Sequence, residues 1–286
     1  MLEFIHDFLK YPFLQLTLLT GILASVACGI IGSYVVVRRI TYIAGGIAHC
    51  VLGGMGAAWY LQVVHGWTFL NPLYGAIAAA LASAVIIGLV SLRARQREDT
   101  VISALWSIGM ATGVLFIART PGYNKDLMSY LFGNILLVSS SDVWLLVALD
   151  ALVVIVGLSF YHQFLAICFD EEFARLRGLN VEFYYLLLLC LIALTVVLLI
   201  SVVGIVMVIA LLTLPVAVAG HFCRTLWQLM LVSALLSMLL TSAGLALSYT
   251  PNLPTGATTI VLAGSVYVLV VLAARLPRLR RRSSSA

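Results

Sequence analysis

A single histidine stands inside a glycine-rich apolar stretch, GGIAHCVLGGMG, at residues 45–56. On a helix, four glycines would surround His49, because each lies three, four or seven residues away from it. These glycines are Gly45, Gly46, Gly53 and Gly56. Imidazole is a common ligand of transition metals, and an ionisable group within an apolar helix is a functional candidate. The stretch therefore predicts either a transient metal ligand or a packing seam whose histidine only hydrogen-bonds a neighbouring helix.

A short charged segment, FDEEFARLRGLN at residues 169–180, could bind a partner. Its apolar residues Phe169, Phe173 and Leu176 fall on one helical face, and charged residues cover the rest. Asp170 is expected to cap the start of this helix and Gly178 its end. The amphipathic helix would either dock a cytoplasmic protein or lie on lipid headgroups.

Further candidates stand alone in apolar runs or turns. Asp150 is either a protonated or hydrogen-bonded structural acid or a ligand or proton carrier. Pro215 is expected to kink or end the helix that contains it. A turn with the sequence LSYTPNLPTGA places Asn252 and Pro254 before the last apolar run. No Ser/His/Asp order, pair of inward carboxylates or HExxH helix is found, which disfavours an intramembrane enzyme.

The elements that position these residues must be membrane-spanning helices. The 286 residues are 63% hydrophobic and 9% charged, with a mean hydropathy of +1.13, so the chain has too little polar surface for a soluble globule. A helical span needs roughly 20 apolar residues. We expect an all-α integral membrane protein, a polytopic bundle of eight or nine transmembrane helices that forms one domain over residues 1–286.

Nine apolar segments fit such spans. They are residues 13–37, 41–62, 70–92, 101–118, 142–161, 183–201, 204–221, 226–249 and 257–276. As one helix, the stretch from Phe183 to Gly220 would run about 57 Å, so it must fold back, and Gly204 is the natural position. An eight-span arrangement with one re-entrant segment stays open, and residues 127–142 could also dip into the membrane.

Charge fixes the orientation, because short loops rich in Lys and Arg stay in the cytoplasm. With the N-terminus outside, only Lys10, Arg119 and Lys125 of the 16 basic residues fall outside. The first apolar run lacks the features of a cleaved signal and is expected to be a retained span. The net charge of +5, which includes the basic tail 275–286, fits anionic lipid better than nucleic acid.

Five cysteines lie in or beside apolar runs without CxxC spacing, so they predict neither disulfides nor a zinc finger. No GxxxxGK[ST] motif is present. If ATP drives this protein, another chain must bind it.

Taken together, the motifs resemble the permease subunits of bacterial zinc and manganese ABC importers. The matching pieces follow the family's order: GSYVVVRR (32–39), the histidine stretch, YLFGNILLVSSSD (130–142), FDEEFARLRGLN, VGIVMVIALLTLPVAVAG and LPTGATTIVLAG (253–264). The resemblance implies a multi-pass protein of the bacterial cytoplasmic (inner) membrane with a type II importer fold. Its expected partners are a second copy or a paralogous permease, two cytoplasmic ATP-binding subunits and an extracytoplasmic metal-binding protein.

The resemblance also assigns roles to residues. His49 aligns with the family's transmembrane histidine, which is proposed to contact the ion. The segment 169–180 aligns with the coupling helix that contacts the ATPase. The expected contact residues are Phe169, Asp170, Glu171, Glu172, Phe173, Arg175 and Gly178.

Two departures bear on the cargo. Family members often have an acid where this chain has Gly45 and another where it has Asn252. Losing hard oxygen ligands favours zinc over manganese as the transported ion. No cofactor is expected to stay bound, and ATP hydrolysis is expected in a separate chain. The alternative is a stand-alone channel or proton-coupled transporter that uses Asp150 and His49.

Overall fold

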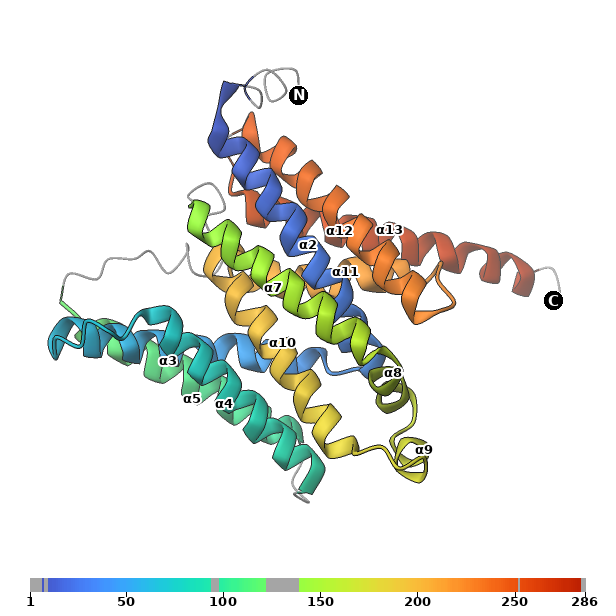
Figure 1. The fold of residues 1–286 in the computed structure, drawn as a ribbon. Coiled ribbons are helices and arrows are strands. Elements are labelled where there is room, and N and C mark those ends of the chain that lie inside the picture. Colours follow the sequence, from blue (N-terminus) through green and yellow to red (C-terminus); the bar gives the residue numbers. More distant parts are fainter. Residues whose placement is uncertain (1–6, 8–9, 94–97, 122–138, 252, 284–286) are drawn as a thin grey trace.

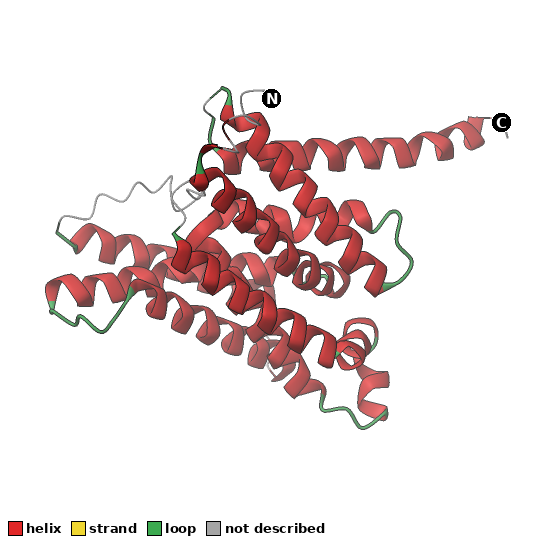
Figure 2. Ribbon diagram, turned by 45° about the horizontal axis from the view of Figure 1, so that its top comes forward, coloured by secondary structure: helices red, strands yellow, loops and turns green. Residues whose placement is uncertain are grey.

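The computed structural model describes residues 7, 10–93, 98–121, 139–251 and 253–283, and every regular element among them is an α-helix (Figures 1 and 2). Eight of these helices are long and apolar enough to cross a bilayer. They are α2 (Pro12–Arg38), α3 (Thr41–Val64), α4 (Pro72–Arg93), α5 (Glu98–Arg119), α7 (Ser140–Ser159), α10 (Val181–Val203), α12 (Leu226–Tyr249) and α13 (Thr255–Ser283). The all-α, multi-pass architecture is confirmed.

The ninth expected span is shorter than the others. Helix α11 (Ile205–Ala219) has 15 residues and is therefore about 22 Å long, less than the roughly 30 Å of a hydrocarbon core. The apolar stretch breaks at Gly204, as expected, where the φ of +87° suits glycine. Helix α11 does not end at Pro215, because it continues to Ala219.

Helix α3 packs against both α4 and α5, and this three-helix group joins the rest mainly through contacts between α4 and α10 (Figure 1). Helix α2 packs against α7, α11 and α12. Small residues bring α2 and α12 together: a Cβ added at Gly29 would lie 2.5 Å from the Cβ of Ala234. The Ser233 hydroxyl donates to the Gly29 carbonyl across this contact, at 3.1 Å.

Two short helices connect α7 to α10 outside the spans. They are α8 (Tyr161–Phe169) and α9 (Glu171–Leu176), and they lie at the end of the bundle where α2 ends and α10 begins (Figure 1). The basic residues Arg38 and Arg93 are the last residues of α2 and α4 and pair with residues of α9 and α10. The charge distribution predicts that this end faces the cytoplasm. Ser139 and Asp142 form a capping box at the start of α7, whereas residues 122–138, including most of the stretch that could dip into the membrane, lie outside the described residues.

Candidate transport site and docking segment

His49 lies on α3 and stacks flat on Trp106 of α5. The ring centroids are 4.2 Å apart, and the ring planes differ by 10°. Gly45, one turn before His49, leaves this space open, since a Cβ at that position would approach only the edge of the Trp106 ring, at 4.0 Å. The Nδ1 atom of His49 is buried and has no hydrogen-bond partner among the described residues. The imidazole is thus held in place by an aromatic neighbour and keeps one nitrogen available.

The other three glycines around His49 face α5. A Cβ at Gly46 would meet the side chain of Ile102 at 2.6 Å. A Cβ at Gly53 or Gly56 would lie 2.8 or 2.9 Å from a backbone carbonyl of α5. We call this contact the α3–α5 seam. At Gly53 and Gly56 its backbones approach so closely that a side chain larger than hydrogen has no room.

The thiol of Cys50 belongs to the same seam. It is buried and donates to the carbonyl of Leu105 on α5, at 3.1 Å. Within the described residues, no group of three or more His, Cys, Asp or Glu side chains could hold a metal ion. Among the described residues, His49 therefore belongs to no cluster that could enclose a metal ion.

Asp150 lies in a different pair of helices. It is 9% exposed on α7 and lies close to Ala27 and Cys28 of α2. Its Oδ2 atom has no hydrogen-bond partner in the described part of the chain. Because His49 packs between α3 and α5, the structure does not bring these two ionisable groups together.

The proline-containing motifs lie elsewhere. Pro215 is buried in α11, where a Cβ at Gly32 of α2 would lie 2.5 Å from the carbonyl oxygen of Leu212, one turn before the proline. Pro254 directly precedes α13, and its carbonyl accepts a hydrogen bond from the backbone N–H of Thr258. Asn252 lies outside the described residues. No described contact joins Pro215 or Pro254 to His49.

The expected helix over 169–180 is shorter in the structure. Phe169 ends α8, Asp170 caps α9 by accepting from the backbone N–H of Phe173 at 3.0 Å, and α9 has six residues. Gly178 has a φ of +77°, and the backbone N–H groups of Gly178 and Leu179 donate to the carbonyls of Arg175 and Ala174. This is a Schellman motif, so the expected glycine stop is where the sequence placed it.

We call residues 169–178 the docking segment. Its apolar side chains are largely exposed: 71% for Phe169, 50% for Phe173 and 87% for Leu176. Ala174 is instead the fully buried residue of α9. The two acids differ as well, because Glu171 forms an ion pair with Arg38 of α2, whereas Glu172 is exposed.

A cavity of about 420 Å³ adjoins the docking segment. Phe169 lines it together with Val37 of α2, Val216 of α11 and the loop residues His221 and Arg224. Nearby, burial raises the pKa of the Cys168 thiol on α8 to about 12, with Arg38 acting in the opposite direction. That thiol therefore stays protonated and serves as a packing group.

Comparison with known proteins identifies the family to which this chain belongs. A model of the ABC 3 transport family matches residues 10–274, and the chain belongs to that family. An uncharacterised membrane protein of Synechocystis is 43% identical over 96% of this chain and 95% of its own length. A probable metal transport system membrane protein of Chlamydia trachomatis is 41% identical, with 92% and 90% covered. The manganese transport system membrane protein MntC of Listeria innocua is 31% identical, with 94% and 93% covered.

The fold is also that of a solved structure. PsaBC from Streptococcus pneumoniae, determined in complex with Fab, aligns with a TM-score of 0.82 and 29% identity over 94% of each chain. The chain is therefore a multi-pass permease of the bacterial inner membrane, as the order of its motifs predicted.

Two residues near the candidate sites escaped the sequence interpretation. Trp106 is separated from His49 by a whole intervening helix, and nothing in their spacing links them. Arg38 was counted among the basic residues on the inner side and quoted within GSYVVVRR, but it was not connected with the docking segment, with which it pairs. The signal that could have flagged Arg38 is its place in GSYVVVRR, among the pieces that resemble the importer family.

Proposed function

We propose that this permease imports a divalent transition metal ion as its cargo, with zinc preferred to manganese. The observation that carries the transport role is the family match over residues 10–274. The relatives named for metal and manganese transport, at 41% and 31% identity, support the cargo class. The preference for zinc rests on ligand chemistry, because the glycine at position 45 leaves an imidazole without a neighbouring carboxylate.

His49 would act as a transient ligand. Its Nδ1 atom is buried and has no hydrogen-bond partner among the described residues, so its lone pair could bind a metal ion. Stacking on Trp106 would fix the plane of the ring. A single protein ligand binds an ion weakly, which suits a pathway that must release its cargo on the far side. A second copy of the chain, or a paralogous permease, would complete the pathway at the interface between the two subunits.

Energy would come from two separate ATP-binding subunits. The chain has no P-loop motif. The docking segment exposes three large apolar side chains, and one of them, Phe169, lines an open cavity; a partner protein would cover apolar groups of this kind. ATP binding and hydrolysis in these partners would open the pathway alternately to each side, and an extracytoplasmic protein would deliver the ion.

Uptake into liposomes tests the cargo directly. The permease would be reconstituted with its ATP-binding subunits and its binding protein, and zinc, manganese and iron would be offered separately and in competition. We expect ATP-dependent zinc uptake that exceeds manganese uptake. Uptake of manganese in preference to zinc would overturn the metal assignment. ATP-independent uptake by the permease alone would overturn the proposal that ATP-binding subunits drive import.

Replacing the histidine tests the pathway. In this assay His49→Ala should lower zinc uptake at least about tenfold, the scale on which metal sites respond to the loss of a contact. His65→Ala is the matched control, because His65 is exposed just beyond the end of the same helix. Equal uptake by the two variants would remove His49 from the pathway.

A channel or proton-coupled transporter built on Asp150 and His49 is not favoured. The two groups lie in separate helix pairs, α2–α7 and α3–α5, with no described contact between them. A relay would need them to exchange a proton directly or through a short chain of polar groups.

A further inference from the structure

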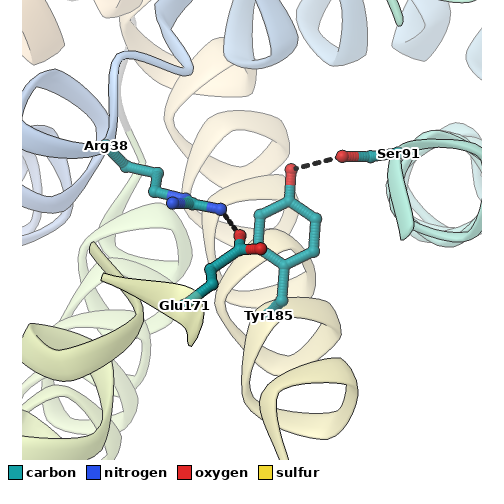
Figure 3. A network of polar contacts seen from close by, with 4 residues as sticks. All are labelled: Arg38, Ser91, Glu171 and Tyr185. Carbon is teal, nitrogen blue, oxygen red and sulfur yellow. Dashed lines mark hydrogen bonds and ion pairs between the residues drawn. The ribbon is translucent and has the colours of Figure 1, made fainter. Parts of the chain in front are cut away.

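Arg38 and Glu171 join the docking segment to the transmembrane bundle (Figure 3). Arg38 is the last residue of α2, and Glu171 is the first residue of α9. Their side chains form an ion pair and are 21% and 31% exposed, so the pair is partly shielded from water. Few groups of α9 are otherwise anchored, since Ala174 is the residue of this helix that is buried.

The same arginine contacts a third element. Its guanidinium lies over the ring of Tyr185 on α10, 5.4 Å from the ring centroid. Tyr185 is 2% exposed, and its hydroxyl is hydrogen-bonded to that of Ser91 on α4, at 3.4 Å. Figure 3 shows these side chains converging between the helices. The guanidinium of Arg38 on α2 therefore contacts both α9 and α10, and the Tyr185 hydroxyl extends this set of contacts to α4.

This position suits the transmission of movement. A six-residue helix is too short to be stable by itself, so α9 is positioned by its caps and by its contacts with the bundle. Helix α2 packs against α7, α11 and α12. A displacement of α9 that pulls on Glu171 thus acts on the end of a helix that packs against several other helices of the bundle.

We propose that Arg38, Glu171 and Tyr185 form a coupling link that transmits movement of the docking segment to α2 and α10. The proposal rests on the proposed function, because it assumes that an ATP-binding partner moves the docking segment. The proposal gives the two neighbouring acids different roles. Glu171 pairs with Arg38 within the link, whereas the exposed Glu172 is available to contact the partner. All three link residues are positioning residues, which act on the pathway through the helices.

A second ion pair provides the matched control. Arg93 at the end of α4 pairs with Glu182 at the start of α10, at the same end of the bundle. It is more exposed, at 68% and 40%, and it involves no residue of the docking segment. Breaking it removes an ion pair of the same type without touching the link.

The test is a charge swap in the complete complex. The variants are Arg38→Glu, Glu171→Arg, the double swap, the milder Glu171→Gln, and the control Glu182→Arg. Three quantities are measured for each: copurification of the ATP-binding subunits, the thermal unfolding midpoint, and metal transported per ATP hydrolysed. The last is the readout that a purely structural role would not change.

We expect both single reversals to keep the ATP-binding subunits bound and to lower metal transported per ATP about tenfold, within the usual range of coupling between sites. The double swap should restore most of this loss, Glu171→Gln should fall in between, and Glu182→Arg should match the wild type. Such a cycle isolates the pairwise interaction from other effects of each change.

Three outcomes would overturn the proposed link. Loss of subunit binding by Glu171→Arg would make Glu171 a docking residue. Unchanged metal transport per ATP in the single reversals, or no rescue by the double swap, would show that the ion pair does not couple the two regions. Failure of the proposed function gives a different result, because the wild-type complex would then transport no metal in the same assay.

Discussion

The α3–α5 seam and the docking segment are packed in opposite ways. In the seam, a Cβ added at Gly53 would lie 2.8 Å from the carbonyl oxygen of Gly109, so the two backbones touch. In the docking segment, the side chain of Leu176 is 87% exposed and that of Phe173 is 50% exposed. The seam has no spare volume between its backbones, whereas the docking segment leaves apolar side chains uncovered.

This difference indicates how the two regions behave when the protein works. Backbones in direct contact cannot slide without losing close packing, so α3 and α5 are expected to move as one unit and keep His49 against Trp106. The docking segment is held by caps and by the coupling link, so it can shift by small rotations at its ends. If the proposed function holds, the seam preserves the geometry around His49, and the docking segment receives the movement of the ATP-binding partner.

The largest expected effect comes from filling the seam. Gly53→Val places a branched side chain against the Gly109 carbonyl and the Thr112 hydroxyl, 2.8 and 2.9 Å from the new Cβ. Overpacking of this kind costs about 1–3 kcal/mol. We expect a lower thermal unfolding midpoint in detergent and a lower yield of monodisperse protein.

Gly45→Ala is the control for that prediction. It lies on the same helix, and its Cβ would meet nothing closer than the Trp106 ring, at 4.0 Å. Alanine is also a better helix former than glycine, by about 1 kcal/mol. The unfolding midpoint should therefore stay the same or rise. If both variants unfold alike, close backbone contact does not stabilise the seam.

An intermediate effect is expected in the docking segment. Leu176→Asp puts a charge on the exposed apolar surface, which should weaken binding of the ATP-binding subunits about tenfold or more, the range of an interface hot spot. The unfolding midpoint of the permease alone should not change, because the side chain packs against little. Binding is measured by copurification and by titration of the separate subunits.

Leu253→Asp serves as the comparison. Leu253 is 52% exposed in the turn before α13, which is expected to face outward. A charge there should leave binding of the subunits intact. Full binding by Leu176→Asp would show that the docking segment is not the site of contact.

The helices could be predicted because span length and apolarity are local properties. Nine expected segments overlap α2 to α5, α7 and α10 to α13, and Gly204 was found as the break between α10 and α11. The length of the apolar run did not show that α11 has only 15 residues, because the run continues through Gly220. Helix ends in apolar runs depend on caps and neighbours, which periodicity does not record.

The side-chain partners were harder to predict. Caps act within a few residues, so Asp170 and Gly178 were recognised from the sequence. The stack of His49 on Trp106 and the pair of Arg38 with Glu171 join distant segments, and no periodic pattern encodes them. The packing of α9 was predicted only in part. Amphipathic spacing identified Phe173 and Leu176 as its apolar face, but gave no indication that Ala174 would be the buried residue.

The smallest expected effect concerns Cys50, which follows His49 in the sequence. Its thiol donates to the Leu105 carbonyl on α5, so it is turned into the seam and engaged there. A thiol is a weak donor, and its loss in Cys50→Ala should cost no more than about 1 kcal/mol. Zinc uptake should stay within about twofold of the wild type, because that cost falls on packing. A loss of uptake as large as that of His49→Ala would mean that the thiol leaves the seam to bind the ion, and the seam would then open during transport.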